Sequence, residues 1–253
     1  MNQKHWNQWV NHNLKELTYT SPVDGTHRFY ILSKLSENEI LLRLRPSHNL
    51  AIVGTRHPTY KSTEWVTHHL FPTLPEDIQI ISGLALGIDA LLHQLCVLNH
   101  HPTLAILGSG FYHPYPKAHL SLLEALVETG NSVISPFTPD TPPRRYQFLQ
   151  RNRWIAEWSK ATLIIEAPQS SGCLNTAKWA REFDRDVYAC CAHPSDTRFQ
   201  GNLNLIARGW AQPFIYPSDL QQTWWNYDFT LPERFSSDLS VENDSSPPSL
   251  PIA

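Results

Sequence analysis

The sequence predicts an α/β fold in which a parallel sheet carries helices on both faces. Between about residues 48 and 217, short runs rich in Ile and Val alternate with longer segments of helical pattern. The short runs are apolar at nearly every position, which is typical of strands that are covered on both faces. Strands that alternate with helices in this way indicate βαβ units and therefore a parallel sheet.

The expected elements follow one another regularly through this central region. The predicted strands are residues 50–53, 78–81, 103–107, 132–134, 161–166 and 187–190. The helices expected between them lie near residues 60–71, 87–99, 117–129, 146–159 and 172–183. Ligands of such sheets bind beyond the carboxyl ends of the strands, so functional side chains are expected there.

Two regions of different character flank this domain, which is expected to span residues 48–226. Residues 1–47 combine an amphipathic opening with two apolar runs, and they predict a small N-terminal appendage of one helix and one or two strands. Residues 227–253 are acidic and rich in Ser and Pro, a composition that predicts a disordered C-terminal tail.

Charge is distributed unevenly along the chain. The 20 Lys and Arg residues stand against 23 Asp and Glu, a formal net charge of −3 that by itself does not indicate a nucleic-acid-binding protein. Residues 227–253 account for −4 of this charge, which leaves +1 for the rest of the chain. Affinity for a polyanion must therefore arise from the local placement of basic residues.

Composition also argues against several classes of protein. Hydrophobic residues make up 41% of the chain, enough for a folded core, and no apolar run approaches the roughly 18 residues of a membrane span. The first residues lack the apolar stretch of a secretory signal, which favours a cytoplasmic location. The four cysteines show no C-x-x-C pair and are expected to be reduced. Several His residues are sequence neighbours that point apart, so no metal site is expected.

Glycine and serine gather at the carboxyl ends of four predicted strands. The four segments are residues 54–56, 82–89, 108–110 and 166–172, and the basic residues Arg56 and Lys117 lie on the same rim. Glycine lets the backbone approach a ligand closely, while serine hydroxyls and N–H groups at helix starts bind phosphate oxygens. A single glycine at such a turn has a purely geometric explanation, but four turns together with two basic residues predict an anion-binding site.

A second basic feature lies in residues 144–154, where four Arg are interleaved with aromatic residues. This combination suits single-stranded nucleic acid, because cations bind the phosphates and rings stack on the bases. Taken alone, the segment is better explained as a helix whose rings belong to the core and whose Arg are solvated or paired with acids such as Glu157. The chain has neither G-x-G-x-x-G nor G-x-x-x-x-G-K-[ST], so neither a dinucleotide cofactor nor a P-loop NTPase is indicated.

No catalytic residue is predicted. Asp89 and His93 lie four residues apart and could share a helix face, but an Asp in the first turn of a helix is more typical of a cap. Cys173 follows Gly172 at an expected helix start, where the pKa of a thiol can be lowered. A packing role is the simpler interpretation of Cys173, and the sequence does not indicate an enzyme.

Several of these segments form an ordered set over about residues 50–210. They are Ala51-Ile-Val-Gly-Thr-Arg56, Ser82-Gly-Leu-Ala-Leu-Gly-Ile-Asp89, Leu107-Gly-Ser-Gly110, Tyr115-Pro-Lys117, Arg151-Asn-Arg-Trp-Ile-Ala156, Ser171-Gly-Cys-Leu174 and Gly201-Asn202. In order and spacing they resemble the DNA-processing protein A family, DprA, which is also called Smf. The S-G-x-A-x-G-I-D and R-N-R segments are specific to that family.

The resemblance implies an extended Rossmann-like domain that binds single-stranded DNA without cutting it and without a cofactor. It also implies a homodimer that helps to load RecA recombinase during natural transformation. By resemblance, Arg56 and Lys117 contact DNA phosphates. Further DNA-binding candidates on the same basis are Ser82, Gly83, Gly108, Ser109, Gly110, Arg151, Asn152, Arg153, Ser171 and Gly172.

The chain also departs from the family pattern. Ser135-Pro136 stands where Ser-Glu is usual, and Cys191-Ala-His-Pro194 stands where Pro-Gly is usual. The N-terminal helical module of the family is expected to be at most a remnant in residues 1–47, and residues 221–253 are too short for its winged-helix module.

Two other functions compete with DNA binding. One is an enzyme like the nucleotide phosphoribohydrolases, whose hallmark P-G-G-x-G-T-x-x-E carries a catalytic Glu. Residues 168–176 lack the second glycine pair, and no Glu stands at the matching place. The other is a nucleotide-sensing protein, which would bind a mononucleotide more tightly than an oligonucleotide.

Overall fold

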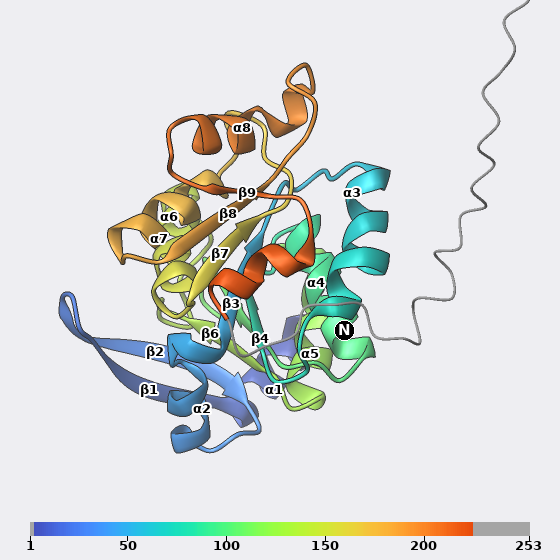
Figure 1. The fold of residues 1–253 in the computed structure, drawn as a ribbon. Helices are drawn as coiled ribbons and strands as arrows, with labels where there is room; N and C mark the ends of the chain where they lie inside the picture. The colour runs from blue at the N-terminus through green and yellow to red at the C-terminus, as the bar shows by residue number, and fades with distance from the viewer. Residues whose placement is uncertain (1–2, 225–253) are drawn as a thin grey trace, which may run out of the picture.

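The computed structural model describes residues 3–224, except for the side chains of residues 221 and 222. The expected tail at residues 227–253 lies outside the described part. Figure 1 shows a twisted sheet that runs through the molecule with helices on both sides. Among the described residues, no helix is long and apolar enough to cross a membrane.

The sheet has nine strands in the order β1-β2-β6-β5-β4-β3-β7-β8-β9. Its seven parallel strands are β3 (Asn49–Val53), β4 (Gln79–Ser82), β5 (Thr103–Ile106), β6 (Ser132–Ser135), β7 (Ala161–Ile164), β8 (Asp186–Cys190) and β9 (Gln212–Phe214). The first six confirm the strands predicted from apolar runs, and their residues are buried at nearly every position. From β3 the chain adds β4, β5 and β6 on one side of the sheet and then β7, β8 and β9 on the other side. The carboxyl ends of β3 and β7 therefore form the switch point of a Rossmann-like sheet.

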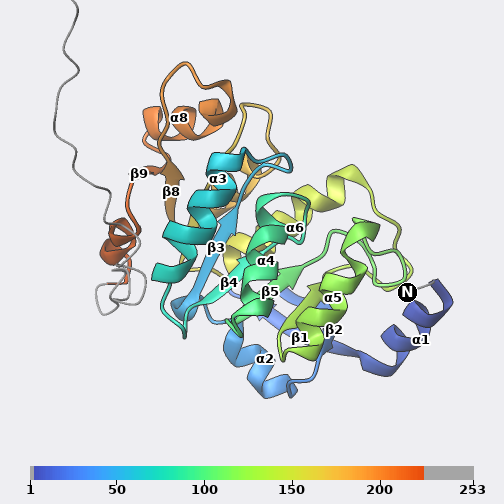
Figure 2. The ribbon, with the colours of Figure 1, turned by 90° about the vertical axis from the view of Figure 1, so that its right-hand side faces the viewer.

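Two layers of helices cover the sheet, as predicted for strands that are buried on both sides. One layer contains α3 (Tyr60–Trp65), which continues through a π turn at Val66–Leu70, with α4 (Ile88–Leu98) and α5 (Leu120–Glu128). The other contains α6 (Arg145–Glu157), α7 (Leu174–Glu182) and α8 (Gln200–Ala207). Figure 2 shows α3, α4 and α5 side by side on the same face.

The N-terminal residues extend this sheet. Helix α1 (Gln3–Asn13) leads into a hairpin of β1 (Leu14–Ser21) and β2 (Gly25–Ser33), and α2 (Glu37–Arg43) follows. Strand β2 pairs antiparallel with β6, and the hydroxyls of Ser33 and Ser132 lie 2.7 Å apart across this pair. One helix and one or two strands were expected in a small appendage at residues 1–47. The structure forms two helices and two strands there, and both strands belong to the main sheet.

Candidate nucleic-acid interface

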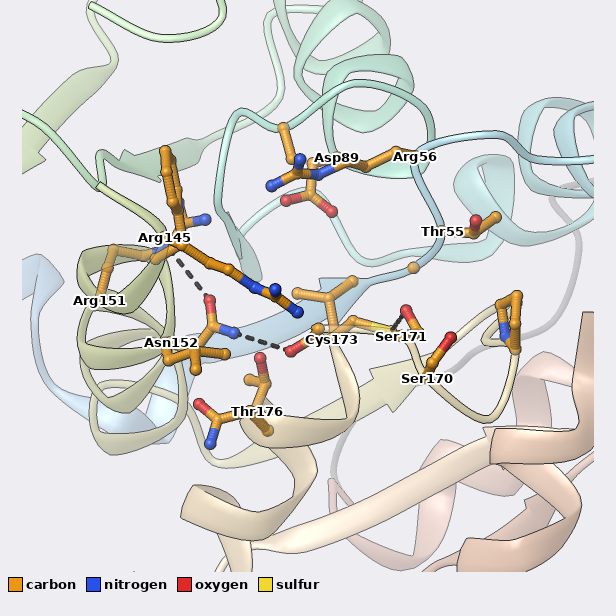
Figure 3. Close-up of a pocket in the computed structure, with 18 of the residues that line it drawn as sticks. Thr55, Arg56, Asp89, Arg145, Arg151, Asn152, Ser170, Ser171, Cys173 and Thr176 are labelled. Atoms are coloured by element: carbon orange, nitrogen blue, oxygen red, sulfur yellow. Dashed lines mark hydrogen bonds between the residues drawn. The ribbon is translucent and has the colours of Figure 1, made fainter. Parts of the chain in front are cut away.

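A cleft of about 870 Å³ opens at the carboxyl ends of the central strands (Figure 3). Its walls come from the turns after β3 and β4, from the first half of α6, and from the turn that begins α7. Arg56 and Asp89 lie on one side of the cleft, and Ser170 and Ser171 lie on the other (Figure 3). The cleft therefore occupies the switch point at which ligands of such sheets bind.

Two arginines with exposed side chains supply positive charge to this cleft. Arg56 follows β3, and Arg145 is the first residue of α6. Within residues 3–224, neither guanidinium forms an ion pair with an acidic side chain. Both side chains therefore have donors available for an anion, and a planar guanidinium suits phosphate oxygens.

Aromatic rings lie beside these cations. The rings of Tyr115 and Phe148 have centroids 5.5 Å apart, and the guanidinium carbon of Arg56 lies 5.7 Å from the Phe148 centroid. Tyr115 is 41% exposed. These residues also line a smaller hollow next to the cleft, together with Leu86 and Pro116. An exposed ring next to a cation offers one surface for a base and another for its phosphate.

Arg151 lies beneath the cleft and is only 4% exposed. Its guanidinium donates to the carbonyls of Gly83 and Ile106, which close β4 and β5, and its Nε donates to Asn152 Oδ1 at 3.1 Å. Burial lowers the pKa of Arg151 to about 10, while the Asp89 carboxylate acts in the opposite direction. Arg151 therefore fixes the turns that form the cleft, and most of its donors are occupied within the protein.

Asp89 and His93 support the same turns from the interior. Asp89 Oδ2 accepts a hydrogen bond from the Gly83 amide at 3.0 Å, and burial raises the pKa of this carboxyl while Arg151 opposes the shift. His93 is fully buried with Nδ1 3.0 Å from Thr103 Oγ1, and burial lowers the pKa of its imidazole to about 3. Both side chains therefore lie in the interior behind the cleft and contact the turns that form it.

The start of α7 forms the opposite wall. Asn152 Nδ2 donates to the Gly172 carbonyl at 3.1 Å and ties this turn to α6. The amide N–H group of Gly172 donates to no backbone carbonyl within residues 3–224, which leaves it available near the positive end of a helix. The Ser171 hydroxyl lies 3.0 Å from Cys173 Sγ. Burial raises the pKa of Cys173 to about 12, the opposite of an activated thiol.

Four predicted residues of the glycine and serine turns face the protein interior. Ser82 is fully buried and donates to the Ile52 carbonyl at 2.7 Å, and Ser109 is also fully buried. A Cβ atom at Gly108 would lie 2.5 Å from the Phe148 ring, and one at Gly110 would lie 2.2 Å from the Thr138 carbonyl oxygen. In this conformation these residues allow close packing behind the cleft.

Two predicted basic residues lie outside the cleft. Arg153 points to the other side of α6, where it contacts Asp24 and Glu157 and lies 4.6 Å above the Trp154 ring. Lys117 is exposed in the 3₁₀ turn Lys117–His119, directly after Pro116 of the smaller hollow. The cleft thus brings together Arg56, Arg151, Asn152, Ser171 and Gly172 from the predicted set.

Sequence reasoning missed Arg145, Phe148 and Tyr115 as site residues. The first two belong to the basic and aromatic segment 144–154 that the sequence marked, but composition could not separate its four arginines. Tyr115 lies in the Tyr-Pro-Lys segment, where Lys117 and not the tyrosine was predicted to contact the ligand. Which of these side chains face the cleft depends on helix phase and on loop packing.

A cleft with cationic and aromatic walls at the switch point of a Rossmann-like sheet is typical of proteins that bind nucleotides or nucleic acids. Comparison with known families agrees with this class. Residues 41–224 match the family described as DNA recombination-mediator protein A, and the chain belongs to this family.

Individual relatives support the assignment. Protein Smf of Synechocystis is 39% identical over 160 residues, which make up 63% of this chain and 40% of that protein. Protein Smf of Escherichia coli is 36% identical over 163 residues, 64% of this chain and 44% of the relative. The matched region thus spans less than half the length of these two relatives.

Two solved structures share the fold. DNA processing protein A from Streptococcus pneumoniae superposes with a TM-score of 0.72 and 26% identity, covering 91% of this chain and 80% of its own. DNA processing protein A from Helicobacter pylori, described for its unique single-stranded DNA binding mode, also gives 0.72, with 20% identity, covering 85% of this chain and 97% of its own. The family and the fold predicted from sequence are therefore confirmed.

Proposed function

We propose that this protein binds single-stranded DNA in the cleft, with Arg56 and Arg145 on phosphates and with Tyr115 and Phe148 against bases. The observation that carries the proposal is that two arginines, which have no acidic partner among residues 3–224, lie beside aromatic rings at the same opening. Stacking on a ring requires an unpaired base, which favours a single strand over a duplex. Membership of the family and the described binding mode of the Helicobacter pylori relative support the proposal.

The turn at Ser171 and Gly172 is a further phosphate contact in this proposal. The Gly172 amide, which donates to no backbone carbonyl within residues 3–224, and the Ser171 hydroxyl lie at the start of α7, across the cleft from Arg56. Phosphate oxygens bind well at such helix starts. A strand that bridges the two walls would have one phosphate on the arginine side and another at this turn.

We propose a binding protein and not an enzyme. Cys173 has a raised thiol pKa, and Asp89 and His93 are buried within structural hydrogen bonds, so none of the three is placed to attack or to transfer a proton. The resemblance to DprA further suggests a cytoplasmic homodimer that acts together with RecA recombinase.

Fluorescence anisotropy with labelled oligo-dT tests the function. Arg56→Ala and Arg145→Ala should each weaken binding about five- to tenfold, because each removes a charged contact of about 1 kcal/mol or more. Lys117→Ala should have a smaller effect, since Lys117 lies outside the cleft.

Arg28→Ala provides the matched control. Arg28 is an exposed arginine of β2, 3.6 Å from Glu16, and removing it changes net charge without touching the cleft. Full binding by the Arg56→Ala/Arg145→Ala double variant would refute the proposed site. Release of free base from a nucleoside monophosphate would instead support the phosphoribohydrolase alternative, and tighter binding of a mononucleotide would support a sensor.

A further inference from the structure

Helix α1 holds one loop of the binding site from outside the cleft. The indole Nε1 of Trp6 donates to the Phe111 carbonyl at 2.7 Å, and Gln3 Nε2 donates to the Tyr112 carbonyl at 3.0 Å. The Tyr112 hydroxyl bonds to Asn11 of the same helix. Three side-chain hydrogen bonds therefore join residues about one hundred positions apart in sequence.

The contact between α1 and this loop is also apolar. Trp6 and Phe111 are both fully buried and belong to one core cluster, which also contains Val10 and Leu107. A hydrogen bond inside such a cluster is costly to break, because the freed carbonyl would remain buried without a partner. The loop cannot leave α1 without exposing this surface.

The held loop, residues 107–116, leads directly to the aromatic wall of the cleft. Its inner side is fixed by the amides of Gly110 and Tyr112, which donate to the Thr141 and Pro139 carbonyls at 2.8 and 2.9 Å. Three residues beyond Tyr112 is Tyr115, whose ring lines the cleft and packs against Phe148. The position of Tyr115 thus depends on a loop that is held from both sides.

We propose that α1 sets the base-stacking position of Tyr115 and that Trp6 is the positioning residue. This inference rests on the proposed function of the cleft. Helix α1 lies outside residues 41–224, the part of the chain that matches the family. Arg56 and Arg145 are carried by other elements, and α1 therefore influences the contacts to bases and not those to phosphates.

Two oligonucleotides separate these two kinds of contact. One is oligo-dT, and the other is an abasic oligonucleotide of the same length and charge. In the unmodified protein oligo-dT should bind more tightly, because only its bases can stack. The variant Trp6→Phe keeps a ring but loses the indole N–H. It should weaken binding of oligo-dT about fivefold and change binding of the abasic strand less than about twofold.

Further variants distinguish positioning from a general loss of folding. Tyr115→Ala should give a similar selective loss, and the Trp6→Phe/Tyr115→Ala double variant should lose little more than Tyr115→Ala alone, since both act through one ring. Gln3→Ala should give a weaker form of the same effect. The control is Gln8→Ala, an exposed glutamine of the same helix without a bond to the loop.

Each outcome decides the inference. Equal weakening of both oligonucleotides by Trp6→Phe, or no change in either, would overturn it, and a selective loss for oligo-dT would support it. Failure of the unmodified protein to bind either strand would refute the proposed function itself, which is a different result from an unselective Trp6→Phe.

Discussion

Arg151 and Arg153 are two residues apart on α6, but their side chains contact different parts of the protein. Arg151 points under the cleft to the Gly83 and Ile106 carbonyls, whereas Arg153 points to the hairpin and its acidic partner Asp24. Arg145, near the start of the same helix, faces the cleft. The chemical role of each arginine is therefore set by helix phase and by what the neighbouring elements offer as acceptors.

Gly83 shows how closely Arg151 is packed. A Cβ atom at this position would lie 2.4 Å from Arg151 Nη1. Gly83→Ala should therefore destabilise the protein by about 1–3 kcal/mol, because the guanidinium would have to leave its two carbonyls or the turn would have to move. Urea unfolding monitored by tryptophan fluorescence measures this difference.

Gly172→Ala is the matched control for that variant. Apart from its chain neighbours, no atom of the described residues lies within 4 Å of a Cβ atom at Gly172, so the free energy of unfolding of this variant should change by less than about 0.5 kcal/mol. Equal destabilisation by the two substitutions would show that the close contact between Gly83 and Arg151 does not control stability.

The hairpin of β1 and β2 is joined to α6 by an ion pair as well as by aromatic packing. Asp24, at the turn of the hairpin, bonds to Arg153, and Phe29 packs edge-on against Trp154 with centroids 4.8 Å apart. The Arg153 guanidinium, with a smaller contribution from His27, holds the pKa of Asp24 well below its ordinary value of 3.8. This element therefore carries a pH-dependent link to the helix that supports the cleft.

The sign of that dependence follows from the lowered pKa. The unfolded chain takes up the Asp24 proton at a higher pH than the folded protein, so the stabilising effect is complete above about pH 4 and declines at lower pH. Asp24→Asn should accordingly reduce the free energy of unfolding at pH 7, and the difference from the unmodified protein should shrink towards pH 2. Chemical unfolding of both proteins at pH 7, 4 and 2.5 tests this, and a constant difference would contradict it.

Elements that are specified locally could be predicted from the sequence, and those that depend on distant partners could not. The strands from β3 to β8 are buried apolar runs, and the glycine-rich turns mark their carboxyl ends. Helix α8 was not anticipated, because its sequence contains polar residues such as Asn202, which is buried and donates to three backbone carbonyls. The pairing of β2 with β6 could not be predicted either, since no local sequence pattern identifies a pairing partner one hundred residues away.

The same distinction applies to the site. Arg56 and the turn at Ser171 follow predicted strands directly, so their place at the cleft could be anticipated. Ser82 and Ser109 also follow strands, but their side chains point inward. Side chains of successive strand residues point to opposite faces, so the direction of the side chain at the end of a strand depends on where the strand ends and on what packs behind it. Sequence spacing determines neither of these.

For the molecule as a whole, positive charge at the site is local. Three arginines line the cleft of a chain whose net charge is −3, and only Arg56 and Arg145 have exposed side chains. Binding of oligo-dT should therefore depend only moderately on salt, with a slope of log K against log[salt] of about −1.4, since each of the two phosphate contacts to a single strand contributes about −0.7.

Anisotropy titrations at several salt concentrations measure this slope. Arg145→Ala should make it shallower by about 0.7, and Arg28→Ala should leave it unchanged. A slope near −5 for the unmodified protein would instead indicate a broad basic surface that engages many phosphates.

The antiparallel pairing of β2 with β6 also has a consequence for synthesis of the chain. The β1–β2 hairpin leaves the ribosome before its sheet partner β6, which ends at Ser135, about one hundred residues later. Until then β2 has unpaired backbone groups along one side, and loop closure over that distance is slow compared with local folding. The edge of β2 therefore stays unpaired in the nascent chain until β6 has been synthesised and can pair with it.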